Sequence, residues 1–178
     1  GWRATHIGIG IAILVVMLPL TFMFRPQPTH ATLAAAETAT EAARADLGVS
    51  PGQLQGLLTL AGFACCVAMS MPQVHIVAYC GDLGYGVARG AEMLALMLGL
   101  GVVSRVASGF LADRIGGPGT LAVGSLMQGL ALLLYLFFDG LTSLYVISAI
   151  FGLFQGGIVP MYAVICREFL PPREAGMR

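Results

Sequence analysis

Five long apolar runs constrain the fold of this 178-residue chain more than any other feature. Each run is long enough to cross the roughly 30 Å hydrocarbon core of a bilayer as an α-helix. Apolar residues make up 57% of the chain and charged residues only 10%, which excludes an ordinary soluble domain. The sequence therefore predicts an all-α, polytopic transmembrane helix bundle with about five membrane helices, near residues 5–24, 53–80, 91–112, 120–138 and 144–166.

The charged and cysteine residues exclude several classes of function. The formal net charge is zero and the nine cationic residues, all arginines, form no polybasic run, so no nucleic-acid partner is expected. The glycine motifs that cradle nucleotide phosphates are absent, and no cofactor is expected. The cysteines lack CxxC spacing and fall in apolar stretches, so neither a metal site nor a disulfide is expected at Cys65, Cys66, Cys80 or Cys166.

Residues 25–52 interrupt the apolar pattern with a stretch rich in Ala, Thr and Pro. Such a composition is typical of a linker, and residues 33–47 have the propensity for a short surface helix. The predicted organisation is one crossing in 1–24, a cytoplasmic linker in 25–52, and four crossings in 53–178. Ser50 to Gln53 reads as a capping box with proline at the first helical position, which predicts the start of the second crossing.

Arg105 is the most informative single residue, because it lies inside the third apolar run. It precedes Arg114 by nine residues, which places it about 13 Å below the turn and near the middle of the bilayer. An arginine there costs about 2.5 to 3.5 kcal/mol on insertion scales, so it needs a partner, a water-filled cavity or an anionic ligand. We expect substrate contact, with a structural ion pair or snorkelling to the interface as alternatives. Ser108 lies on the same helical face and leaves room beside it.

Other polar residues at membrane depth complete the predicted binding site. Gln73 and His75 follow Pro72 within one turn, where a proline loosens the backbone ladder. Gln155 and Tyr162 are seven residues apart and are expected on one helix face, where they would line a cavity or bond to a neighbouring helix. Gly152 and Gly156 form a GxxxG pair, for which close helix packing is the favoured interpretation.

Arginines at loops and helix ends predict the orientation. The positive-inside rule places the larger group on the cytoplasmic side, which gives an outside N-terminus and a cytoplasmic C-terminus in the plasma (inner) membrane. The larger group is Arg25, Arg44, Arg114, Arg167, Arg173 and Arg178, and the smaller is Arg3 and Arg89. The turn after the third run combines an Asp-Arg pair with a Gly-Gly-Pro sequence, and Asp113 is placed to accept from backbone N–H groups at a neighbouring helix start.

This turn resembles the loop signature of the major facilitator superfamily through Gly109, Asp113, Arg114, Gly116 and Gly117. The signature recurs after the second and eighth helices of that twelve-helix fold, and this copy looks like the eighth-to-ninth loop. The long linker two helices earlier, the GWR opening, GGIVP and REFLPP are similar to the corresponding parts of monocarboxylate transporters and oxalate/formate exchangers. The resemblance implies a partial fold covering helices six to ten, with the remaining helices absent and both ends cut. This sequence departs from the family's loop signature at Gly117-Pro118, where one or two further basic residues are common in the family.

The resemblance implies a secondary active transporter that moves a small organic anion, a monocarboxylate or dicarboxylate, by alternating access. In monocarboxylate transporters an eighth-helix arginine similar in place to Arg105 meets the substrate carboxylate. The expected partners are the anion, a proton or counter-anion, membrane lipids and the missing helices of the full-length chain; symport and antiport both stay open. The alternatives are a non-transporting helical membrane subunit or truncated relic and, less favoured, a membrane enzyme, since no HExxH, GxSxG or other catalytic arrangement occurs.

Overall fold

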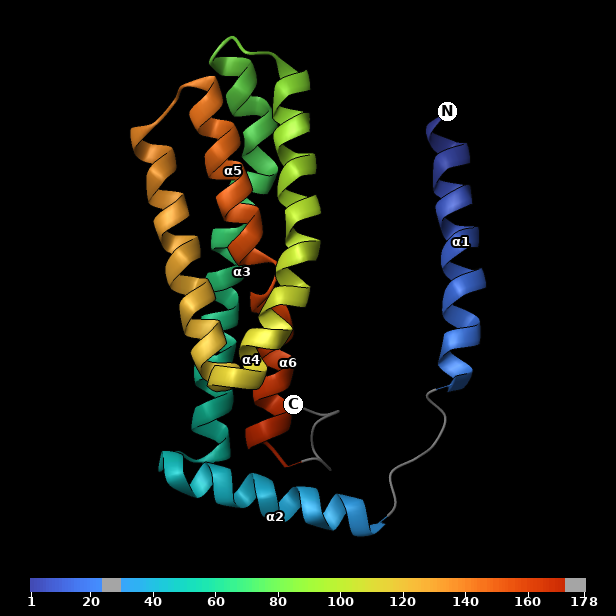
Figure 1. The fold of residues 1–178 in the computed structure, drawn as a ribbon, viewed down its shortest axis with the longest axis vertical. Helices are drawn as coiled ribbons and strands as arrows, with labels where there is room; N and C mark the ends of the chain where they lie inside the picture. The colour runs from blue at the N-terminus through green and yellow to red at the C-terminus, as the bar shows by residue number, and fades with distance from the viewer. Residues whose placement is uncertain (24–29, 172–178) are drawn as a thin grey trace. The chain divides into compact units, whose positions relative to one another are not determined.

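The computed structural model describes residues 1–23 and 30–171, and within them all regular structure is helical. The helices are α1 (Trp2–Met23), α2 (His30–Leu47), α3 (Pro51–Asp82), α4 (Val87–Phe137), α5 (Leu141–Gln155) and α6 (Ile158–Phe169) (Figure 1). The chain divides into two compact units, Gly1–Glu37 and Thr38–Arg178. The predicted all-α class is confirmed.

Helix α1 matches the first predicted crossing, and its side chains are exposed throughout. Its 22 residues include Pro19, which does not end the helix. Helix α2 covers the predicted surface helix and begins a few residues earlier than expected. The length and apolar composition of α1 are those of a membrane span, and none of its residues is buried.

Helix α3 begins as the capping box predicts. The Ser50 hydroxyl accepts from the Gln53 backbone N–H, and the Gln53 side chain accepts from the Ser50 N–H. The turn after α3 is shorter than the gap of 81–90 between the second and third predicted crossings, since only residues 83–86 lie between α3 and α4. Gly90 belongs to α4, where a Cβ would lie 2.6 Å from the Val77 Cα, so this glycine serves helix packing rather than the turn.

Helix α4 contains two crossings. Its 51 residues would span about 77 Å if straight, more than twice the hydrocarbon thickness. Gly116 interrupts it with φ 78° and ψ 168°, a conformation that favours glycine, and the chain reverses direction there (Figure 1). The Thr120 hydroxyl donates to the Gly116 carbonyl at 2.9 Å. The predicted third and fourth runs are therefore the two halves of α4, joined by a tighter turn than expected.

The fifth predicted crossing is present as one apolar stretch, and a short break that was not predicted divides it into two helices. Helix α5 ends at Gln155 and α6 begins at Ile158, with Gly156 and Gly157 between them. Pro160 lacks the N–H that would bond the carbonyl of Gly156, and its ring crowds that carbonyl. Together α5 and α6 still form one apolar stretch of 29 residues, enough for one crossing.

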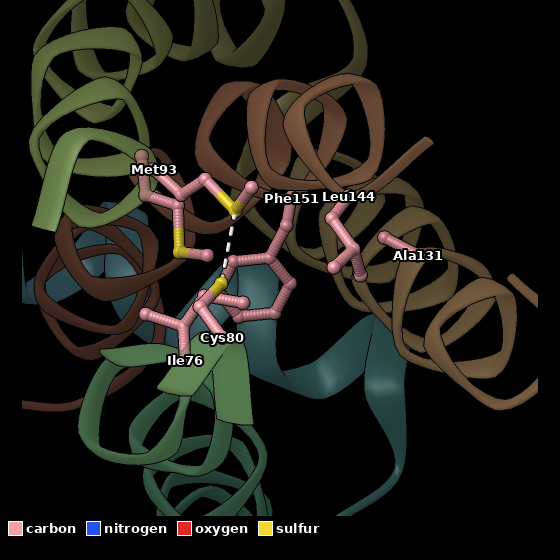
Figure 2. Close-up of a cluster of buried hydrophobic side chains, with 7 residues drawn as sticks. Ile76, Cys80, Met93, Ala131, Leu144 and Phe151 are labelled. Carbon is pink, nitrogen blue, oxygen red and sulfur yellow. Dashed lines mark hydrogen bonds between the residues drawn. The ribbon is translucent and has the colours of Figure 1, made fainter. Parts of the chain in front are cut away.

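The bundle of α3 to α6 has a hydrophobic core near the end that carries the two short turns. We call it the sulfur-rich core; Figure 2 shows Phe151 and Leu144 of α5 directed toward side chains of α3 and α4. The Cys80 thiol lies 3.6 Å from the Met93 sulfur. The core comprises Ile76, Cys80, Met93, Met97, Ala131, Leu144 and Phe151.

Candidate functional site

The first half of α4 contacts α5 and α6 through a line of small residues, which we call the glycine seam. It comprises Gly101, Ser104 and Ser108 of α4 with Gly152, Gly156 and Gly157, and the Met97 backbone extends it by one turn. A Cβ on Gly152 would lie 2.6 Å from the Met97 carbonyl oxygen, and one on Gly156 would overlap the Gly101 carbonyl oxygen. Backbones approach this closely only where side chains are absent. The close-packing prediction for the GxxxG pair is confirmed.

Ser104 completes the seam at the break between α5 and α6. Its buried hydroxyl accepts a hydrogen bond from the Gly157 backbone N–H at 3.0 Å. The broken helix leaves backbone groups without their usual partners, and this hydroxyl satisfies one of them. Sequence analysis missed Ser104, because a lone serine among apolar residues carries no signal until its partner helix is known.

Arg105 lies next to the seam with its side chain exposed on the bundle surface. Within the described part of the chain its guanidinium has no hydrogen bond and no ion pair. Ser108 is half-buried, and its hydroxyl donates to the Arg105 carbonyl at 3.1 Å, not to the guanidinium. Arg105 is therefore an exposed cation next to Ser104, the residue that bonds α4 to the break between α5 and α6.

Gln73 and Gln155 are brought together across the bundle. The Gln73 amide donates to the Gln155 side-chain oxygen at 2.6 Å, joining α3 to the last residue of α5. Gln155 is 3% exposed, and its nitrogen lies 3.9 Å from where a Cβ on Gly101 would be. Gly101 is one helical turn before Arg105, so the amide pair lies beside the turn of α4 that precedes Arg105.

Tyr162 and His75 lie elsewhere. The break after Gln155 removes the shared helix face expected for Gln155 and Tyr162, and the Tyr162 ring instead lies 3.9 Å from the Cβ position of Gly62. His75 is exposed and lines a mostly apolar groove between α3 and the second half of α4, with Tyr79, Leu132 and Tyr135 among its neighbours. The structure thus joins Gln73 to Gln155 by a hydrogen bond and places Ser108 one turn after Arg105 on α4, whereas His75 and Tyr162 lie apart from these residues.

The loop motif is built around a close approach to α6. Gly117 is buried, and a Cβ there would lie 3.0 Å from the Ile165 side chain. Asp113 and Arg114 are exposed, and among the residues that the structure describes neither side chain has a hydrogen bond or ion pair. The expected bond from a backbone N–H to Asp113 is not formed. Gly109 is half-buried with open space beside it. Arg25, Arg173 and Arg178 lie outside the described residues.

The opposite end of the bundle carries polar contacts that sequence analysis did not identify. Glu92 pairs with Arg89 at 3.0 Å and also accepts a hydrogen bond from the Tyr145 hydroxyl, which links α4 to α5. The Tyr85 hydroxyl donates to the Asp139 carbonyl at 3.1 Å and links the two short turns. These contacts hold the ends of the crossings in register without involving Arg105.

Comparison with known proteins supports the resemblance found in the loop motif. The model of the Major Facilitator Superfamily matches residues 1–177. Monocarboxylate transporter 13 of Rattus norvegicus is 32% identical over 102 residues, which are 56% of this chain and 24% of that protein; the protein of the same name in Bos taurus matches with the same identity and coverage. The matched segment thus spans about a quarter of these relatives. No solved structure matches. The apolar helices, the glycine loop and the family match together show that this chain is an integral membrane protein of the major facilitator superfamily.

Proposed function

We propose that the full-length protein carries a small organic anion, a monocarboxylate or dicarboxylate, across the membrane by alternating access. The observation that supports this most is Arg105, an exposed guanidinium within a membrane span that no described side chain neutralises. The two relatives are monocarboxylate transporters by name, which favours the same chemical class.

The chemistry around Arg105 suits a carboxylate. A guanidinium is a planar fork of donors that can bind both oxygens of a carboxylate at once, and the pairing strengthens away from bulk water. Neutral hydrogen-bonding groups lie nearby in Ser108 and in the Gln73–Gln155 amide pair. Of these groups, the half-buried Ser108 hydroxyl and Gln73 amide can bind a second polar substituent on the anion without adding charge, while the buried Gln155 oxygen accepts from Gln73. We place Tyr162 and His75 outside this first set of contacts.

Alternating access requires one group of helices to move against another around a central site. The glycine seam supports a rigid group, because it joins the first half of α4 to α5 and α6 through backbone contact. In this proposal the first half of α4, α5 and α6 move as one rigid body, and Arg105 moves with them. The protein lies in the plasma (inner) membrane, with residue 1 outside and the loop at Gly116 on the cytoplasmic side, as the distribution of arginines favours.

Uptake by the full-length parent protein tests the proposal. We expect Arg105→Ala to reduce the initial rate of labelled lactate, oxalate or formate uptake by about 30-fold or more, since a desolvated charge pair is lost. Arg105→Lys keeps the charge without the fork and should recover part of the rate. Arg44→Ala removes an arginine of α2 that is not at membrane depth and should leave uptake close to wild type. Equal uptake by the wild type and Arg105→Ala would exclude Arg105 from the site.

A further inference from the structure

We propose that the bundle binds one ordered water molecule at a buried polar site between α3, the second half of α4 and α6. We call it the Gln128 site, and it comprises Cys65 of α3, Gln128 of α4 and Tyr162 of α6. This inference involves neither Arg105 nor the transported anion, so it stands apart from the proposed function. It rests on an amide donor, on the groups around it and on the space that a glycine leaves beside them.

Gln128 carries a hydrogen-bond donor that no side chain or backbone group nearby satisfies. The residue is 3% exposed, and its amide nitrogen is fully covered inside the bundle. Among the residues that the structure describes, that nitrogen has no hydrogen-bond partner. Because the nitrogen has no exposed surface, a further helix packed on the outside of the bundle has no access to it. A buried amide donor without a partner is strongly unfavourable at membrane depth, so a partner small enough to lie inside the bundle is required.

Two other helices bring polar groups to the Gln128 amide. The Cys65 thiol donates to the Gln128 side-chain oxygen at 3.9 Å, a long contact between α3 and α4. Cys65 lies one turn after Gly62, and the Tyr162 ring lies 3.9 Å from the Cβ position of Gly62. The Tyr162 hydroxyl also interacts with the Cys65 thiol. An amide, a thiol and a hydroxyl from three helices therefore gather at one place.

Gly62 leaves the space that a water molecule needs beside these groups. A Cβ at Gly62 would have two atoms of the Tyr162 ring within 4 Å, at 3.9 and 4.0 Å, and no closer contact outside its own helix backbone. A methyl group thus fits there without displacing any atom. A water molecule is of similar size, and it binds stably inside a protein when it has two to four polar partners. The Gln128 nitrogen, the Tyr162 hydroxyl and the Cys65 thiol can supply three.

The water gives the contact between α3, α4 and α6 a different character from the glycine seam. Backbone contact in the seam fixes the distance between helices, whereas a bridging water can change its hydrogen-bond geometry as helices shift. In this inference Tyr162 and Gln128 are positioning residues of the bundle. Neither contacts the anion.

Radiolytic hydroxyl labelling of the full-length parent protein tests for the water, because radicals formed from a bound water oxidise the side chains beside it. Cys80 is the matched control, since it is also a buried cysteine but lies in the sulfur-rich core. We expect Cys65 to be labelled about fivefold faster than Cys80, and this difference to disappear in Gly62→Ala, whose methyl group takes the place of the water. Equal labelling in the wild type, or a difference that Gly62→Ala leaves unchanged, would overturn the proposal.

Thermal stability of the detergent-solubilised protein provides a second test through the sign of one substitution. Alanine favours a helix over glycine, so Gly62→Ala would raise the unfolding midpoint if it filled empty space. If it displaces the water and leaves the Gln128 amide without a partner, we expect the midpoint to fall by about 3 °C. In a Gln128→Met background no amide loses its partner, and Gly62→Ala should then raise the midpoint. A change of the same sign in both backgrounds would contradict the water site, and a rise in the wild type alone suffices for this if Gln128→Met does not fold.

Discussion

The glycine seam and the sulfur-rich core both hold α4 against α5, but by different means; the seam also reaches the break before α6, and the core also includes α3. In the seam, backbones touch at Gly152 and Gly156, and no side chain separates α4 from α5. In the core, large flexible side chains such as Met93 and Phe151 fill the space between continuous helices. A side-chain-filled core can repack when one member changes, whereas a backbone contact has no means of adjustment. Rigidity in this bundle is therefore concentrated at the seam.

The two regions also differ in polarity. Arg105, Ser104 and the Gln73–Gln155 pair lie at or near the seam, whereas the sulfur-rich core has beside it the hydroxyls of Tyr135 and Ser148, which are hydrogen-bonded to each other. A polar group at membrane depth needs partners held at fixed positions, since lipid offers none. The proposed binding site thus lies beside the part of the bundle that is held most tightly.

The largest effect is expected at the centre of the seam. Gly156→Ala places a Cβ 2.1 Å from the Gly101 carbonyl oxygen, so α4 and α5 must separate. We expect a loss of about 3 kcal/mol of stability and little folded protein, measured as thermal stability of the detergent-solubilised protein by size-exclusion chromatography. Gly129→Ala is the matched control, because a Cβ there has no atom within 4 Å. Equal stability of both variants would contradict the prediction that the seam is rigid.

An intermediate effect is expected at the amide pair. Gln73→Leu keeps the approximate volume but leaves the buried Gln155 side chain without its partner, which should cost about 1 kcal/mol. The Gln73→Leu/Gln155→Leu double variant removes both groups and should recover part of this loss. Thermal stability of the four proteins gives the coupling free energy. Additive losses would show that the hydrogen bond contributes nothing to holding α3 against α5.

The smallest effect is expected in the sulfur-rich core. Met93→Leu is a volume-conserving change at a fully buried side chain, and we expect it to cost about 0.5 kcal/mol as neighbouring side chains readjust. The same thermal assay measures it. A loss as large as that of Gly156→Ala would mean that the core is as unadaptable as the seam, and the contrast between the two regions would fail.

Much of the fold was predictable from local signals. The capping box at Ser50 and the five apolar runs located the crossings to within a few residues, and the GxxxG pair indicated a packing face. The break after Gln155 was not predicted, although Gly156, Gly157 and Pro160 carry its signal. Membrane helices tolerate glycine and proline when neighbours satisfy the freed backbone groups, so these residues alone do not show where a helix ends.

The candidate site was predictable only in part for a related reason. A single arginine in an apolar run stands out in sequence, and Arg105 was found in this way. The partner of Gln155, the role of Ser104 and the separation of His75 from the guanidinium depend on which helix faces meet.

The sequence by itself determined how many times the chain crosses the membrane and where each crossing begins, because transfer of a segment into lipid depends on that segment's own residues. The tertiary structure alone decided which faces touch, where the last crossing breaks and which polar groups surround Arg105. Lipid tails and helix interiors are similarly apolar, so hydropathy does not distinguish a lipid-facing surface from a packed one, and only close backbone packing and hydrogen-bond partners select between them.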